Sequence, residues 1–106
     1  MIRYVRSDKA QPGKWSEARE EARRFAKFIN ENCSPTTPLE VLTPISGTGD
    51  RRVTMVADFE DMGVWERWWQ SLTSQEGMSE LMSNWAKLFI LEDLDVRFYW
   101  VAAPLE

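Results

Sequence analysis

The order of apolar periodicities along the chain constrains the fold more than any other feature of the sequence. From Trp15 to Cys33 the apolar residues recur at helical spacing and form one stripe, which predicts an amphipathic helix entered through a turn at residues 12–14. Short β-prone segments flank this helix, at residues 2–6 before it and at residues 39–45 and 52–59 after it. The first half of the chain therefore predicts the order strand, helix, strand, strand.

The second half predicts a broken helix and a last strand. Asp61 is placed to cap a helix over residues 62–72, whose apolar arc carries Trp65, Trp68 and Trp69. Residues 73–77 interrupt it, a further amphipathic helix covers residues 78–89, an acidic loop covers residues 92–95, and a strand covers residues 96–101. The order β-α-β-β-α-β predicts an α+β fold of the ferredoxin-like type, with a four-stranded antiparallel sheet and helices on one face. The 106 residues fit one domain, 1–106.

The segment at residues 46–50 lies between two predicted strands and contains Gly47 and Gly49. A phosphate-binding loop of this kind would need a strand before it and a helix after it. We therefore interpret the segment as a hairpin turn.

Strand parity sorts the sheet residues into two faces. The nearly all-apolar set is expected to face the helices: Ile2, Tyr4, Leu39, Val41, Val53, Met55, Ala57, Phe59, Val96, Phe98 and Trp100. The opposite set is mixed, and its apolar members Leu42, Val56, Tyr99 and Val101 lie among charged residues. Because the helices cover only one face, these four residues predict a homodimer formed through the second face of the sheet. A solvated face with scattered apolar residues is the alternative.

Composition excludes several classes of function. The chain has no histidine, which removes Ser-His-Asp and Cys-His triads, histidine-ligated haem and most zinc sites. A single cysteine excludes an internal disulfide, and no secretory leader is recognisable, so we expect a cytoplasmic protein. The net charge of −4 argues against nucleic acid or an anionic membrane as partner, and no apolar run approaches the roughly 20 residues of a membrane helix. We expect no metal and no cofactor.

Three short motifs carry a resemblance to a known family. They are Tyr4-Val5-Arg6 in the first strand, Pro12-Gly13-Lys14 at the helix entrance and Phe59-Glu60-Asp61 before the tryptophan helix. With the broken second helix, they make the chain resemble the dimeric α/β-barrel superfamily, and within it the NIPSNAP-like branch. Asp8 departs from the aromatic residue frequent in that branch, and residues 74–76 replace its aspartate-proline-like turn. The resemblance implies a dimeric α/β barrel, in a superfamily that includes cofactor-independent monooxygenases, isomerases, cyclases and haem enzymes.

We expect a ligand cleft between the tryptophan helix and the helix-facing side of the sheet. Its candidate ligand-binding residues are Tyr4, Arg6, Trp65, Trp69, Trp85 and Trp100. The aromatic side chains would form flat apolar walls, and Arg6, near the mouth of the cleft, would bind an anionic oxygen of the ligand. Two alternatives stay open, because tryptophans at helical spacing also suit a closed core and Arg6 also has Asp8 as a neighbour at the rim.

These residues predict a small-molecule-binding homodimer. The resemblance adds cofactor-independent monooxygenase or isomerase activity on a small aromatic or hydrophobic substrate. The alternative is a non-catalytic binding or assembly module with the same dimeric fold. The sequence assigns no catalytic residue, since Cys33 has no histidine to activate it and the acidic run at residues 92–95 lacks the spacing of a calcium loop.

Overall fold

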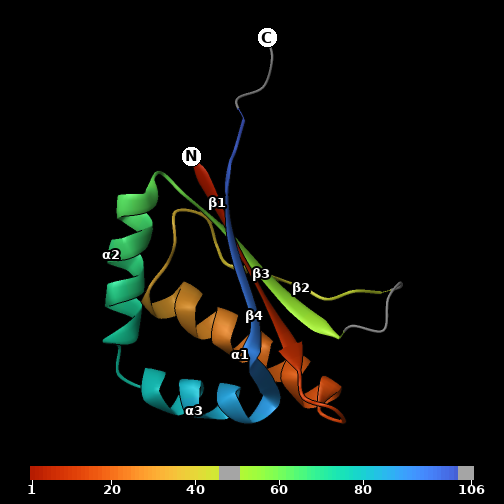
Figure 1. Ribbon diagram of the computed structural model, residues 1–106. Helices are drawn as coiled ribbons and strands as arrows, with labels where there is room; N and C mark the ends of the chain where they lie inside the picture. Colours follow the sequence, from red (N-terminus) through yellow and green to blue (C-terminus); the bar gives the residue numbers. More distant parts are fainter. Residues whose placement is uncertain (46–50, 103–106) are drawn as a thin grey trace.

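The computed structural model describes residues 1–45 and 51–102, and the predicted hairpin turn at residues 46–50 lies outside this part. Within it, four strands and three helices follow one another in the predicted order (Figure 1). In chain order they are β1 (Ile2–Ala10), α1 (Trp15–Asn32), β2 (Glu40–Leu42), β3 (Arg52–Phe59), α2 (Met62–Thr73), α3 (Met78–Leu88) and β4 (Phe89–Trp100). The predicted α+β fold and the break in the second helix are confirmed.

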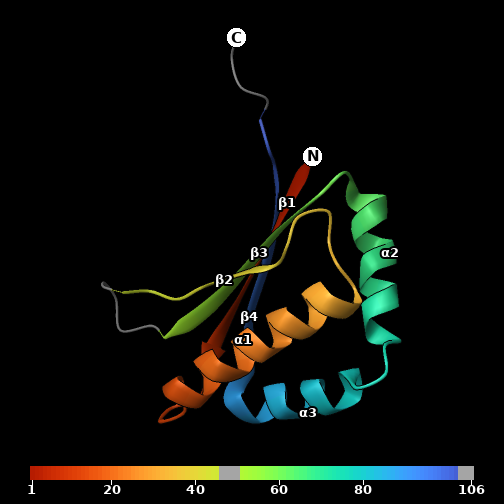
Figure 2. The same cartoon turned by 180° about the vertical axis from the view of Figure 1, so that it is seen from behind.

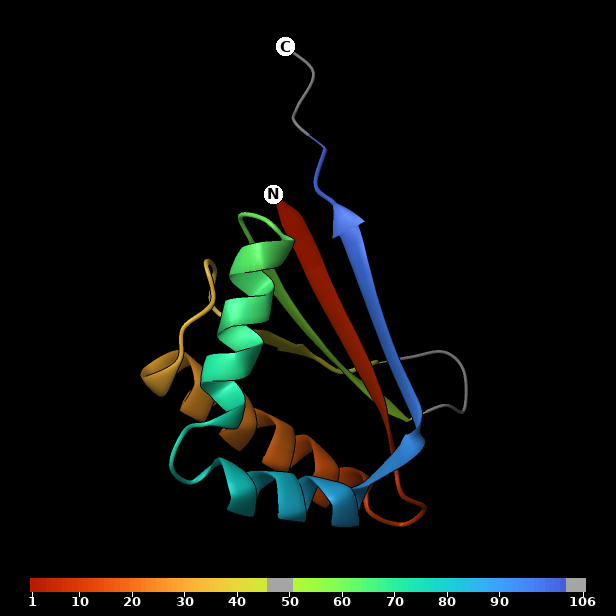
Figure 3. The same ribbon diagram turned by 60° about the vertical axis from the view of Figure 1, so that its left-hand side comes forward.

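The strands form one antiparallel sheet in the order β2-β3-β1-β4. The two central strands, β1 and β3, come from the two halves of the chain and pair along most of their length, from Ile2 opposite Phe59 to Lys9 opposite Arg52. This order is the ferredoxin-like one, in which each half of the chain supplies one central and one edge strand. Figure 3 shows the three helices gathered on one side of the strands.

The hydrophobic core lies between this sheet face and the helices. Alternate residues of β1 and β3 are buried, as the parity predicted, among them Tyr4, Met55 and Phe59. From α1 the core receives mainly small residues, which let the helix axis approach the sheet closely: Ala18, Ala22, Ala26, with Phe25 and Ile29. The predicted helical stripe is therefore the buried face of α1.

Local sequence explains where the helices begin and end. Gly13 has a φ of 77° in the turn before α1, a conformation that favours glycine. Asp61 caps α2 as predicted, because its side chain accepts a hydrogen bond of 2.9 Å from the backbone N–H of Val64. Gly77, with a φ of 87°, ends the interruption and precedes α3. The chain can thus turn sharply between α2 and α3, as Figure 2 shows.

The last strand differs from the prediction. No separate acidic loop exists at residues 92–95, because β4 runs without interruption from Phe89 to Trp100. Its register with β1 is irregular at this place: Ser7 pairs with Asp95 but Lys9 pairs with Ile90, so β4 contains extra residues here. Only the part of β4 beyond this irregularity was predicted as a strand. The rest of β4 was missed because pairing with β1, which is far away in the sequence, extends the strand.

The helices leave β4 largely uncovered at the edge of the sheet. Val96, Phe98 and Trp100 have the parity of the helix-facing set, since they pair with Arg6, Tyr4 and Ile2. They were expected to be covered by the helices, but they are 38%, 37% and 82% exposed. Parity sets the face to which a side chain points, whereas cover depends on how far the helices reach across the sheet.

Candidate ligand-binding site

One row of side chains on β1, directed to the helices, holds both polar and aromatic candidates. Tyr4, Arg6 and Asp8 follow one another in this row, and each is less than a tenth exposed. The row leads from an aromatic region next to α2 to a charged region next to α3. Two clusters result, and they share the strand but differ in their chemistry.

The charged cluster consists of Arg6, Asp8 and Trp85. Arg6 Nε donates to Asp8 Oδ2 at 2.9 Å, and Arg6 Nη2 donates to Asp8 Oδ1 at 3.3 Å. From α3, the indole Nε1 of Trp85 donates to the same Asp8 Oδ1 at 3.2 Å, and the Arg6 guanidinium lies 5.8 Å from the centre of the Trp85 ring. Every oxygen of the Asp8 carboxylate thus receives a donor from inside the chain.

The pairing within the charged cluster keeps Arg6 charged. Burial by itself acts to lower the pKa of Arg6, but the hydrogen bonds and the charge of Asp8 outweigh it, and the pKa is raised. Arg6 therefore stays a cation bound to Asp8. The sequence suggested that Arg6 lies at the mouth of a cleft, and this expectation is wrong, because Arg6 is buried. The alternative of a pairing with Asp8 is the observed one, although the pair is buried and not at the rim.

The aromatic cluster consists of Tyr4, Trp65, Trp69 and Phe98. Trp65, on α2, lies at the centre, with ring centroids 5.7 Å from Tyr4, 4.8 Å from Phe98 and 6.0 Å from Trp69. Trp65 and Trp69 stack and are partly buried, while Phe98 on the edge strand is more than a third exposed. The cluster thus joins the core on its Tyr4 side and reaches the surface between α2 and β4.

The indole N–H groups of three tryptophans differ in how they are paired. Trp68 Nε1 donates to the backbone oxygen of Cys33 at 2.7 Å, and Trp85 Nε1 donates to Asp8. Trp65 Nε1 is buried and has no acceptor among the described residues. Buried donors are almost always paired, so this N–H is a polar position to which a ligand oxygen would contribute a missing hydrogen bond.

The ring of Tyr4 lies next to that of Trp65, and its hydroxyl interacts with Arg6. Burial dominates over the influence of Arg6 and raises the pKa of Tyr4 above its ordinary value. The hydroxyl is therefore protonated at neutral pH and can donate a hydrogen bond, but it is a poor base. A substrate that gives up its proton without help from the protein does not need Tyr4 as a base.

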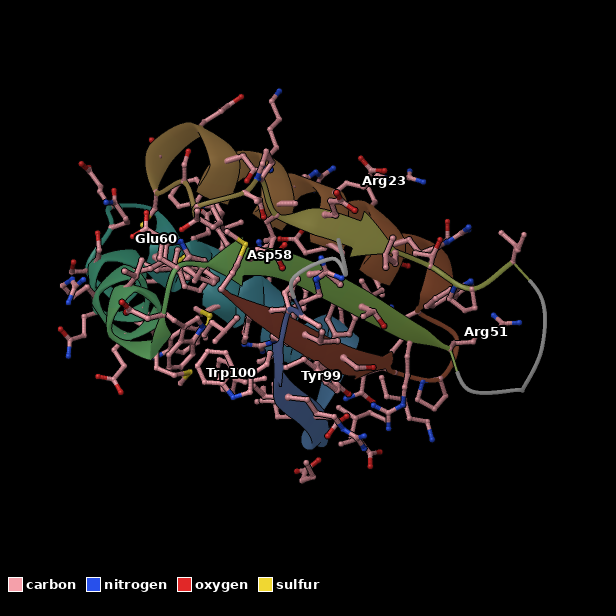
Figure 4. The ribbon with its side chains drawn as sticks, turned by 90° about the horizontal axis from the view of Figure 1, so that it is seen from above. Arg23, Arg51, Asp58, Glu60, Tyr99 and Trp100 are labelled. Carbon is pink, nitrogen blue, oxygen red and sulfur yellow. The ribbon has the colours of Figure 1, made fainter. Side chains whose placement is uncertain are left out.

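The structure brings five of the six predicted residues into two neighbouring groups and leaves one apart. Tyr4, Trp65 and Trp69 are in the aromatic cluster, and Arg6 and Trp85 are in the charged cluster. Trp100 lies at the end of β4 beside Tyr99 and is mostly exposed (Figure 4). Sequence reasoning missed Phe98 as a wall of the site, and it placed the Arg6–Asp8 pair at the rim, whereas the pair is buried. The parity of Phe98 and the buried-side position of Asp8 were signals that could have indicated both.

The described part of the chain contains no group of three or more side chains suited to hold a metal ion. In the same part, no helix is long and apolar enough to cross a membrane. Three surface hollows lie away from the aromatic cluster: one along α1, one between α1 and α3, and one on the outer face of the sheet. The candidate site is thus a packed aromatic region with an unpaired donor, and not one of these three hollows.

Comparisons with known proteins agree with this architecture. The sequence matches no protein-family model and no curated protein. The structure is similar to that of an uncharacterized NIPSNAP domain protein from Burkholderia xenovorans, with a TM-score of 0.80 and 17% identity over 100% of this chain and 99% of that one. The predicted resemblance to the dimeric α/β-barrel superfamily and its NIPSNAP-like branch is confirmed as a likeness of fold.

Two further solved structures have the same architecture. SnoaB, a cofactor-independent oxygenase from Streptomyces nogalater, has a TM-score of 0.68 and 14% identity over 98% of this chain and 95% of that one. A dimeric protein of unknown function and ferredoxin-like fold from Bacteroides fragilis has a TM-score of 0.70 and 7% identity, over 92% of this chain and 93% of that one. At these identities the likeness establishes the ferredoxin-like fold and nothing finer.

Proposed function

We propose that this protein is a homodimer that binds a small aromatic or hydrophobic molecule at the aromatic cluster. The observation that carries the proposal is the buried Nε1 of Trp65, which has no acceptor although flat apolar rings surround it. A ligand with a planar body and a carbonyl or hydroxyl oxygen supplies what this position lacks. The ligand enters where Trp69 and Phe98 reach the surface, and their side chains turn aside to admit it.

The proposed chemistry is cofactor-independent oxygenation or isomerisation of the bound molecule. In the oxygenation, an electron-rich aromatic substrate loses a proton from a ring methylene and reacts with O₂, which leaves a ring carbonyl and one water. Trp65 Nε1 and the Tyr4 hydroxyl would donate hydrogen bonds to the substrate oxygen on which negative charge develops. The fold that this chain shares with SnoaB, described as a cofactor-independent oxygenase, supports this reaction class.

A calorimetric titration with two matched probes tests binding at Trp65. The probes, 2-acetylnaphthalene and 2-ethylnaphthalene, share their ring system and differ by one carbonyl oxygen. We expect Trp65→Phe to weaken binding of the ketone about tenfold, or roughly 1.4 kcal/mol, and to leave the hydrocarbon unaffected. Trp69→Phe is the control, since it removes a neighbouring indole and keeps Trp65 Nε1. Equal affinity of the parent and Trp65→Phe for the ketone would contradict the proposal.

The non-catalytic binding module is favoured by one observation, the complete internal pairing of Asp8, which leaves this buried carboxylate without a free oxygen to act as a base. Oxygen uptake in the presence of a chelator, with anthrone as the electron-rich substrate, separates the two functions. Uptake above the uncatalysed rate that depends on Trp65 identifies an enzyme. Binding of the ketone without such uptake identifies the module.

The outer face of the sheet is the proposed dimer interface. Leu42 and Tyr99 are about half exposed there, and a hollow of about 310 Å³ is lined by Val5, Leu42 and Val56 among others. Arg3 and Asp58 form an ion pair of 2.8 Å beside these apolar residues. An apolar centre with paired charges around it is typical of a two-fold interface between identical chains.

Light scattering tests the dimer. We expect a dimer at micromolar concentration for the parent and a monomer for Val56→Glu, because the substitution places one charge of each chain against the other. Met82→Glu on the exposed surface of α3 is the matched control and should remain dimeric. A parent protein that is monomeric under these conditions would contradict the proposed interface.

A further inference from the structure

Two further buried polar atoms without a partner among the described residues lie on α1, away from the aromatic cluster: Arg19 Nε and Glu21 Oε1. Glu21 is only 5% exposed, and its Oε1 has no hydrogen-bond partner among the described residues. Its other oxygen, Oε2, lies 3.5 Å from Nη1 of Arg24, whose side chain is 67% exposed. Half of a buried carboxylate is therefore left without a donor, which is costly unless a bound group supplies one.

Glu21 lies where two hollows of the surface meet. One hollow, of about 500 Å³, follows α1 and ends at Leu88, and the other, of about 390 Å³, lies between α1 and α3. Glu21 and Arg24 line both of them. Figure 2 shows α1 and α3 running next to each other on the helical side of the molecule. Glu21 thus lines a groove that is open to the surface, and its buried Oε1 reaches this groove when the side chain turns.

The hollow between α1 and α3 combines an apolar floor with negative charge. Phe28 and Leu81 contribute the apolar surface, and Gly77 lies next to the Phe28 ring. Glu80 is an exposed second carboxylate at this hollow. Glu21 and Glu80 carry two negative charges against the single positive charge of Arg24, so the lining favours a cation.

We propose that this groove binds a small organic cation, a primary ammonium group on an apolar body. The ammonium donates to Glu21 Oε1, and the apolar body packs on Phe28 and Leu81. A charge-assisted hydrogen bond to a buried carboxylate is among the stronger polar contacts that a protein offers. The inference is independent of the proposed function, because none of these residues belongs to the aromatic cluster.

Calorimetry with phenethylammonium tests the groove, with 2-phenylethanol as the neutral probe of similar shape. We expect saturable binding of the ammonium, with at least a tenfold loss in Glu21→Gln and no comparable binding of the alcohol. Glu31→Gln removes a charge from the exposed end of the same helix, outside both hollows, and should bind as the parent does. Equal affinity of the parent and Glu21→Gln, or no saturable binding by the parent, would overturn the proposal.

A second variant keeps the test decisive if Glu21→Gln does not fold. Glu80→Lys changes an exposed residue at the mouth of the hollow and places a competing cation there. We expect it to fold and to lose at least tenfold in affinity for phenethylammonium, whereas Glu31→Lys makes the same charge change outside the hollows and keeps the affinity. Equal losses in both lysine variants would show a general charge effect and overturn the specific site.

Discussion

The charged cluster and the aromatic cluster share one strand but differ in how completely their polar groups are paired. In the charged cluster, Asp8 receives donors from Arg6 and Trp85 on both of its oxygens, and every partner is buried. In the aromatic cluster, Trp65 keeps a buried N–H without an acceptor, and its neighbours reach the surface. A closed network stabilises a single structure, whereas an unpaired donor at the edge of a packed region is a position for a ligand.

This difference changes which residue is expected to recognise a ligand. A buried arginine next to aromatic residues suggests an anion site, yet Arg6 already has its anion two residues along the same strand. A tryptophan in a helical stripe suggests core packing, yet Trp65 has a buried N–H donor without an acceptor among the described residues. Residue type therefore indicates a site less well than the pairing of its atoms does.

Breaking the charged cluster should have the largest effect on stability. Asp8→Asn keeps the shape of the side chain and leaves the buried Arg6 cation without its counter-charge, which should cost about 3–5 kcal/mol in the free energy of unfolding. Asp58→Asn is the matched control, because its partner Arg3 is about half exposed and water screens the pair, so its loss should be much smaller. Urea unfolding of both variants measures the two losses, and similar losses would contradict the buried network.

Two indoles of α2, Trp68 with a paired N–H and Trp65 with an unpaired one, should respond differently to the same substitution. Trp68→Phe leaves the backbone oxygen of Cys33 without its donor, whereas Trp65→Phe removes an N–H that has no partner. Both lose a comparable volume of ring, so the difference between them isolates the hydrogen bond. We expect Trp68→Phe to be less stable by about 1–3 kcal/mol in urea unfolding. An equal or larger loss in Trp65→Phe would show that Trp65 is a structural residue.

The fold was predictable from sequence wherever the signal is local. The stripe of α1, the cap at Asp61 and the alternation in β3 each follow from neighbouring residues, and all three are observed. The course of β4 was not predictable in full, because the acidic residues 92–95 resemble a loop and only pairing with β1 draws them into a strand. Trp100 shows the same limit, since its parity was right but the helices do not reach it.

The candidate sites were predictable in part for a related reason. The sequence indicated Tyr4, Trp65 and Trp69 as neighbours, and the structure places them in contact. It could not show which indole N–H lacks an acceptor, because the acceptors for Trp68 and Trp85 come from elements far away in the chain. Glu21 directly precedes Ala22 at the border of the apolar stripe of α1, and a charged residue there carries no local signal of burial. Its burial depends on α3, which only the tertiary structure brings beside it.

Nitrogen-15 NMR of the tryptophan indoles tests the central claim most directly, because each Nε1–H gives a signal of its own. The protein is titrated with 2-acetylnaphthalene and, in parallel, with 2-ethylnaphthalene, and single Trp→Phe variants assign the signals. The account predicts that the ketone moves the Trp65 signal to lower field, as a newly formed hydrogen bond does, and that the signals of Trp68 and Trp85, already paired, do not move in this way. It also predicts that the hydrocarbon produces no such low-field shift. An unchanged Trp65 signal at saturating ketone, or the same shift with both probes, would contradict the claim that this N–H recognises a ligand oxygen.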